Sequence, residues 1–121
     1  MLGQRTLLVN PPPIEGIRFT RQGRCQERED VLGTTKPPYT LVLLASLLRE
    51  SGCEVRLIDQ TAENLSAKDL IARLKVEKFT PTIVIFCSTT PTLEADAAEM
   101  LTFKEHWQVP IFCFGPHASC A

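Results

Sequence analysis

Four short apolar segments recur along the chain and are separated by longer stretches in which apolar residues are spaced three and four apart. Short apolar runs bounded by turn-forming residues are typical of buried strands, and spacings of three and four are typical of amphipathic helices. The pattern predicts strands at 6–9, 54–58, 83–87 and 111–114. Because the last two are almost continuously apolar, we expect them to be central strands of a parallel sheet.

Three amphipathic helices are predicted between these strands. The first spans 39–51 and stops at Gly52, the second begins after Ser66 as N-cap, and the third spans about 91–105 with Thr90 as N-cap. The apolar residues expected to face the core are Leu41, Leu44, Ala45 and Leu48 in the first helix, Leu70, Ile71 and Leu74 in the second, and Leu93, Ala97, Met100 and Leu101 in the third.

The alternation of strands and helices predicts an α/β fold with a doubly wound parallel sheet and helices on both faces, in three layers, because each return to a parallel strand needs a right-handed crossover. The whole chain, 1–121, is interpreted as one domain. Since it ends soon after the fourth strand, we expect it to be a fragment of a longer enzyme, truncated after that strand.

The composition excludes several classes of function. With a formal net charge of −1, the chain has no basic stripe of the kind that binds nucleic acid or anionic membranes. No apolar run approaches the length of a membrane span, and the N-terminus lacks the pattern of a secretory signal, so a cytoplasmic protein is expected. The 5 cysteines lack metal-binding spacing and are interpreted as reduced thiols.

Polar or conformationally special residues follow each predicted strand. They are Asn10-Pro11-Pro12-Pro13, Asp59 to Asn64, Ser88-Thr89-Thr90 and Gly115-Pro116-His117. Ligands of open parallel sheets bind outside the carboxyl ends of the strands, so these loops are expected to form one site. The hydroxyl run from Ser88 to Thr92 opens a helix, where side-chain oxygens and unpaired backbone N–H groups suit a phosphate or a polar ligand tail. The alternative is helix capping alone.

The connection at 10–38 is too long for an ordinary loop, and we favour a lid over a solvated segment. Residues suited to catalysis are sparse, and neither catalytic residues nor metal ligands are assigned. His106 is expected at the surface, and His117 either contacts a ligand or makes a hydrogen bond within a turn. For Asp59 and Glu63, capping of the loop is a better interpretation than a role as general acid or magnesium ligand.

Several of these segments, in this order, carry a resemblance to a known family. They are Leu7-Leu8-Val9-Asn10-Pro11-Pro12, Gly23-Arg24-Cys25, Lys36-Pro37-Pro38, Gly52 to Asp59, Ser88-Thr89-Thr90-Pro91-Thr92 and Gly115-Pro116-His117-Ala118-Ser119. Together they resemble the N-terminal cobalamin-binding domain of cobalamin-dependent radical S-adenosylmethionine enzymes. The resemblance implies a flavodoxin-like fold that carries the corrin ring over the carboxyl ends of the strands. It also implies a neighbouring radical domain of the same parent chain, which would hold S-adenosylmethionine and a 4Fe-4S cluster.

The resemblance also implies a set of residues that bind cobalamin. Asn10 and Pro11 would shape the rim under the corrin, Thr61, Ala62 and Glu63 would lie near the lower axial face, and Ser88, Thr89, Thr90, Gly115, Pro116 and His117 would hold the nucleotide tail. For Asn10 to Pro13 a rigid turn is the alternative. The DxHxxG motif that gives cobalt a histidine ligand in other cobalamin proteins is absent from this sequence. The cofactor is therefore expected to be base-off, without a histidine from this loop.

The function favoured by the resemblance is that of the cofactor domain of a radical methyltransferase in which methylcobalamin carries the methyl group. A cyclase or rearrangement enzyme of the same family is the first alternative. A flavodoxin-like or receiver-like regulatory module is the second, although the acidic pair of a receiver is replaced by Asn10-Pro11. The chain alone is not expected to be catalytic.

Overall fold

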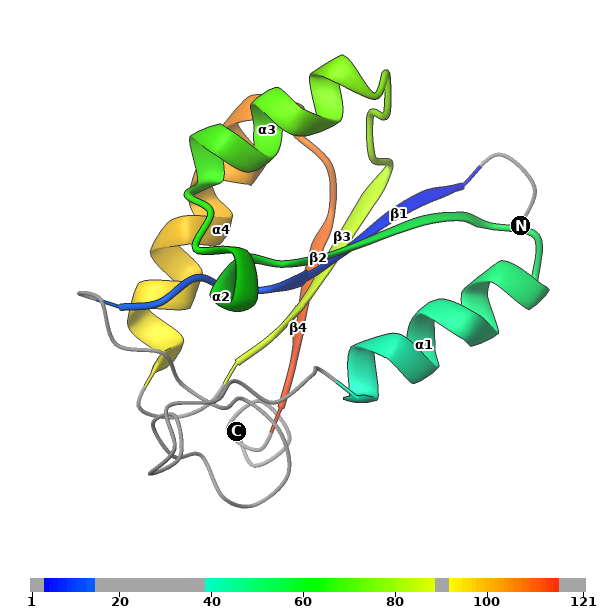
Figure 1. Ribbon diagram of the computed structural model, residues 1–121, viewed down its shortest axis with the longest axis horizontal. Helices are drawn as coiled ribbons and strands as arrows, with labels where there is room; N and C mark the ends of the chain where they lie inside the picture. The colour runs from blue at the N-terminus through cyan, green and yellow to red at the C-terminus, as the bar shows by residue number, and fades with distance from the viewer. Residues whose placement is uncertain (1–3, 15–38, 89–91, 116–121) are drawn as a thin grey trace.

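The computed structural model describes residues 4–14, 39–88 and 92–115, which form an open four-stranded sheet (Figure 1). The strands are β1 (Arg5–Asn10), β2 (Glu54–Asp59), β3 (Ile83–Cys87) and β4 (Ile111–Phe114). All pairs are parallel and the order is β2-β1-β3-β4. This arrangement confirms the predicted flavodoxin-like α/β fold. The predicted strands are all present, with β1 and β2 one or two residues longer than expected.

The helices lie on both faces of the sheet. They are α1 (Tyr39–Glu50), α2 (Gln60–Glu63), α3 (Ala67–Val76) and α4 (Leu93–Trp107). Helix α1 covers one face, and α3 and α4 lie side by side on the other (Figure 1). Within the described part of the chain, no helix combines the length and the apolarity that crossing a bilayer requires.

The two faces of the sheet bury cores of different size. The larger core lies under α3 and α4 and contains Leu7, Val9, Ile58, Ala67, Leu70, Leu74, Phe79, Val84, Phe86, Met100 and Phe103. The smaller core lies under α1, where Leu8, Leu41 and Cys87 are buried and Leu44, Ala45 and Leu48 pack against them. The face predicted for the first helix is therefore confirmed.

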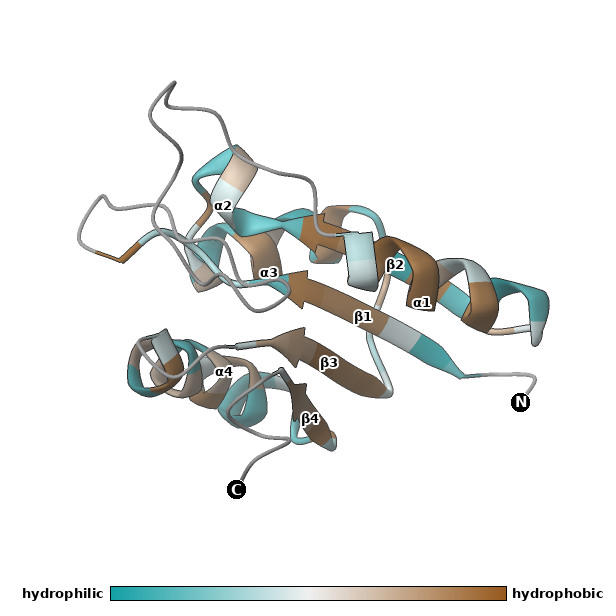
Figure 2. Ribbon diagram, turned by 90° about the horizontal axis from the view of Figure 1, so that it is seen from below, coloured by the Kyte–Doolittle hydropathy of each residue, from teal (hydrophilic) through white to brown (hydrophobic). Residues whose placement is uncertain are grey.

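The central strands are β1 and β3; in Figure 2, β3 is hydrophobic along its length, whereas β1 begins hydrophilic and becomes hydrophobic further along. β3 was expected at the centre, but the expectation for the fourth strand was wrong: β4 lies at an edge of the described sheet, and its Phe112 side chain is 55% exposed. An apolar run indicates a strand, but it does not reveal whether both of its sides will be paired.

The start of α3 was predicted correctly. The Ser66 hydroxyl accepts a hydrogen bond from the backbone N–H of Asp69 at 3.2 Å, as an N-cap does. Leu70 and Leu74 are fully buried, and Ile71 packs at the margin of the larger core.

Helix α4 differs from its prediction in the face that it buries. Met100 is buried as expected and Leu93 is half-buried, but Ala97 is exposed and Leu101 is 56% exposed. The buried positions are instead Asp96, Met100 and Phe103. The helix begins at Leu93 with Thr92 in the N-cap position, and the expected cap Thr90 lies outside the described residues.

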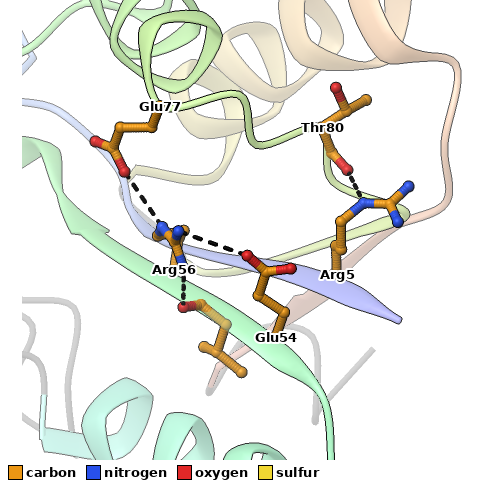
Figure 3. A network of polar contacts seen from close by, with 6 residues as sticks. Arg5, Glu54, Arg56, Glu77 and Thr80 are labelled. Atoms are coloured by element: carbon orange, nitrogen blue, oxygen red, sulfur yellow. Dashed lines mark hydrogen bonds and ion pairs between the residues drawn. The ribbon is translucent and has the colours of Figure 1, made fainter. Parts of the chain in front are cut away.

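Charged side chains form a network of polar contacts near the amino ends of β1 and β2 (Figure 3). Arg56 Nε is 3.2 Å from Glu77 Oε1, and Arg56 Nη2 is 3.5 Å from Glu54 Oε1. On the neighbouring strand, Arg5 Nε donates to the backbone carbonyl of Thr80 at 2.6 Å. The contacts with Glu77 and Thr80 join β2 and β1 to the α3–β3 connection, whereas Glu54 and Arg56 pair within β2, so this end of the sheet has a structural role.

Candidate functional site

The carboxyl ends of the strands form the candidate site. The chain passes from β1 to β2 on one side and then crosses to β3 on the other side of β1. The order of the strands therefore reverses between β1 and β3, which is where ligands of open α/β sheets bind. Asn10, Asp59, Ser88 and Gly115 come at the ends of the four strands and meet at this edge.

Asn10 links three strands. Its Nδ2 donates to Asp59 Oδ1 at 2.8 Å, and its Oδ1 accepts from the Cys87 thiol at 3.4 Å. The residue is buried, and these two contacts set the orientation of its amide. These contacts of Asn10 therefore form a rigid junction between the ends of β2, β1 and β3.

Asp59 begins a one-turn helix, α2, where a loop was expected. Its Oδ1 accepts from the backbone N–H of Ala62 at 3.0 Å, and the turn ends at Asn64 with φ 52°. The hydroxyl of the buried Thr61 donates to the carbonyl of Pro11, which ties α2 to the end of β1. The capping role favoured for Asp59 is confirmed.

Glu63 forms an ion pair with Arg73 of α3. Glu63 Oε1 lies 2.9 Å from Arg73 Nη2, and Arg73 Nη1 donates to Glu63 Oε2 at 3.1 Å. This hydrogen-bonded carboxylate raises the pKa of the Arg73 guanidinium. Both side chains are partly exposed, so the pair orients the Glu63 carboxylate at the surface beside α2.

Ser88, Thr92 and Asp96 form a buried cluster where β3 gives way to α4. The hydroxyls of Ser88 and Thr92 both donate to Asp96 Oδ2, each at 2.7 Å. Ser88 and Asp96 are 2% exposed and Thr92 is fully buried. Ser88 is therefore at the predicted edge, but its hydroxyl is engaged with a carboxylate of the protein.

Asp96 was missed by the sequence analysis. An aspartate in an amphipathic helix is ordinarily assigned to the solvent face. The available signal was spacing: Asp96 lies four residues after Thr92 and four before the apolar Met100, on the same side of a helix as both. Its effect also reaches β4, because burial and, secondarily, the Asp96 charge raise the pKa of the Cys113 thiol.

Gly115 allows the end of β4 to approach the end of β3. Its φ is +142°, and a Cβ at this position would lie 2.0 Å from the carbonyl oxygen of Ser88. The backbone N–H of Ser88 donates to the carbonyl of Phe114 at 3.0 Å. The nucleotide tail was expected to pass close to Gly115, and that role stays a prediction; the group that lies against Gly115 in this structure is the Ser88 carbonyl.

A polar pocket of about 300 Å³ adjoins this edge and is lined by Pro12, Pro13, Asn64, Leu65, Ser66, Asp69 and Glu99. Gln60 lies behind its wall and donates through Nε2 to Glu99 Oε1 at 3.2 Å and to the Leu65 carbonyl at 3.1 Å. Gln60 is fully buried, so it braces this wall. No group of three or more potential metal ligands occurs among the residues that the structure describes.

Several predicted features lie outside the described residues. They are Thr89, Thr90, Pro116 and His117 of the predicted site, and residues 15–38 of the predicted lid. Their roles stay predictions. His106 is exposed beside Trp107, with ring centres 5.5 Å apart, which agrees with its expected surface position. Cys53, Cys87 and Cys113 are free thiols.

Comparison with known proteins gives one informative relative. No protein-family model matches the chain, and no solved structure matches it significantly. The chain is 34% identical over 116 residues to an uncharacterized methyltransferase of Pyrococcus horikoshii. The match covers 95% of this chain but 22% of the relative, so the chain spans about a fifth of the length of that protein. Nearly the whole chain is therefore similar to one part of a methyltransferase.

Proposed function

We propose that this chain binds cobalamin at the carboxyl edge of its sheet and serves as the cofactor-binding part of a radical S-adenosylmethionine methyltransferase. The observation that carries the proposal is the set of polar side chains from the strand ends, gathered where the strand order reverses. The similarity to a methyltransferase supports the class of reaction.

The donor chemistry of the edge fits a cofactor that takes no metal ligand from it. Among the described side chains there, Asp59 is bound to Asn10 and to the N-terminus of α2, and Glu63 is paired with Arg73. The Cys87 thiol donates to Asn10 and is buried. Because these potential ligands are engaged within the protein, cobalamin would be held through its periphery rather than through its cobalt.

The proposed contacts follow from exposure as well as position. Ala62 and Glu63 are exposed on α2, next to the buried Thr61, and would meet the lower side of the corrin. Asn10 and Pro11 would act beneath the rim as a rigid support, since both are buried. The junction at Ser88 and Gly115 would border the nucleotide tail. Cobalamin, when bound, would supply a cobalt atom that carries a methyl group.

The remaining parts of the reaction belong to the rest of the parent protein in this proposal. S-adenosylmethionine and a 4Fe-4S cluster would be held by a radical domain of the same parent chain, which would be the partner of this domain. The role of the chain itself is to bind and orient the cofactor.

The test is retention of a corrinoid. The purified chain is mixed with hydroxocobalamin, freed of excess by gel filtration, and examined by visible spectroscopy. Stoichiometric retention with a base-off spectrum is expected. Loss of all corrinoid from a chain that circular dichroism shows to be folded would overturn the proposal.

A matched pair of variants locates the binding surface. Ala62→Trp places a bulky side chain on the exposed face of α2, where the corrin is proposed to lie, and should abolish retention. Ala72→Trp makes the same change at an exposed position of α3 and should leave retention unchanged. Equal behaviour of the two variants would contradict the proposed position of the corrin.

A further inference from the structure

We infer that Asp96 is a positioning residue that holds Ser88, at the end of β3, and Thr92, before α4, in the relative position needed for binding of the nucleotide tail of cobalamin. The inference rests on the proposed function and assigns a part of that site to a residue that does not itself contact the cofactor. It concerns the described residues Ser88, Thr92 and Asp96.

Asp96 joins the two sides of this junction with a single oxygen. Ser88 follows the last residue of β3, and Thr92 precedes the first residue of α4. Both hydroxyls donate to Asp96 Oδ2 at 2.7 Å. Hydrogen bonds to an ionised carboxylate are short and about twice as strong as neutral ones, so this oxygen fixes both sides at once.

Ser88 is also held from β4. Its backbone N–H donates to the Phe114 carbonyl, and its own carbonyl lies against Gly115. Asp96 therefore connects α4 to a point where β3 and β4 already meet. The position of the first turn of α4 relative to the sheet edge depends on this connection as well as on the apolar contacts of Met100 and Phe103.

The burial of the cluster determines how Asp96 can act. An aspartate is costly to bury unless its charge is matched by hydrogen bonds, and here two hydroxyls supply them. Because each hydroxyl has one proton and gives it to Asp96, neither can donate to a phosphate. In this inference the two hydroxyls act through Asp96, as an alternative to the sequence-based expectation that the Ser88 hydroxyl holds the phosphate.

The experiment compares cobalamin with cobinamide, a corrinoid that lacks the nucleotide tail. Dissociation constants of both are measured by absorbance titration for the wild-type chain, Asp96→Asn and a control, Glu105→Gln. Glu105 is an exposed acidic residue in the last turn of α4, so the control makes the same change of charge on the same helix at a distance from the candidate site. We expect Asp96→Asn to weaken cobalamin binding about tenfold, with cobinamide binding unchanged, because a neutral amide replaces a charged acceptor.

Thr92→Val provides a second variant if Asp96→Asn does not fold. It keeps the shape of the side chain and removes one of the two donors, so a smaller loss confined to cobalamin is expected. A general destabilisation of the fold would weaken the binding of both corrinoids alike, and equal losses of affinity for cobalamin and cobinamide would overturn the role of Asp96. Unchanged binding of both by the folded variants would overturn it too. Failure of the wild-type chain to bind either corrinoid would instead refute the proposed function itself, and this inference with it.

Discussion

Replacing Gly115 by alanine should destabilise the chain by about 5 kcal/mol, more than is usual for the addition of one methyl group. The new Cβ would lie 2.0 Å from the Ser88 carbonyl oxygen, a distance at which the atoms overlap. The backbone of Gly115 is a second obstacle, because residues other than glycine rarely adopt its φ of +142°. The two ends of the strands must therefore separate in the variant.

The magnitude follows from three costs. Backbone conformations that are essentially restricted to glycine cost about 1–3 kcal/mol for other residues. Relief of the overlap requires a backbone shift, and overpacking of this kind costs about 1–3 kcal/mol. That shift also weakens the hydrogen bond from Ser88 N–H to the Phe114 carbonyl, worth about 1 kcal/mol. The loss is a large fraction of the stability of about 5–15 kcal/mol that is typical of small domains.

The assay is urea denaturation, followed by far-ultraviolet circular dichroism and by the fluorescence of Trp107. Trp107 is the single tryptophan and stacks on the buried Phe103 with ring centres 5.4 Å apart, so it reports on the packing of α4. Gly52→Ala is the matched control. Gly52 has φ +93° and is exposed after α1, so its replacement carries the backbone cost of about 1–3 kcal/mol.

The comparison of the two variants can refute the reasoning. If Gly115→Ala and Gly52→Ala lower the free energy of unfolding equally, the close approach of Gly115 to Ser88 does not occur. A Gly115→Ala chain as stable as the wild type would contradict both the contact and the backbone argument.

Three further predictions concern the core, the cap of α2 and the effect of pH. Phe103→Ala should cost about 3–5 kcal/mol in urea denaturation because it opens a cavity under α4, whereas Leu101→Ala on the exposed side should cost less than about 1 kcal/mol; similar losses would show that the buried face of α4 is misassigned. Asp59→Ala should cost about 2 kcal/mol by the same measurement, since it removes both the N-cap of α2 and the acceptor of the Asn10 amide, and a loss below about 0.5 kcal/mol would contradict the junction. The pKa of Cys113 is raised in the folded chain, so its thiol adds stability that is fully present below about pH 8.5 and is lost as the pH rises through the folded pKa; Cys113→Val should flatten this decline in urea titrations from pH 7 to about pH 10, and an unchanged slope would refute the assignment.

Features that depend on neighbouring residues in the sequence were predicted well. The Ser66 cap of α3 and the stop of α1 before Gly52 are settled within one helical turn. The buried face of α1 was also correct, because Leu41, Leu44, Ala45 and Leu48 follow a regular helical spacing. The four strands were found for the same reason, since each is a compact apolar run.

The candidate site was predicted as a location but not as a set of contacts. Parallel strands bring their carboxyl ends to one edge whatever their order, and so Asn10, Ser88 and Gly115 could be grouped from the sequence. Which side chains bond to each other depends on register and on strand order. The pairing of Asn10 with Asp59 requires β2 to lie beside β1 in one register, and nothing local in the sequence specifies it.

The chain's own pattern was sufficient for the four strands, for the three longer helices and for the edge of the sheet that carries the candidate site, because backbone periodicity and capping act over a few residues. It did not reveal the one-turn helix α2. The tertiary structure alone decided that β4 lies at an edge of the described sheet and that α4 turns Asp96 inward and Leu101 outward. Apolar spacing alone did not indicate this face, since Asp96 is charged; its burial accompanies hydrogen bonds from Thr92, which is near in sequence, and from Ser88, which the packing of β3 against α4 brings to it. A polar residue can face the core when the fold brings its partners to it, and those partners are known only once the elements are packed.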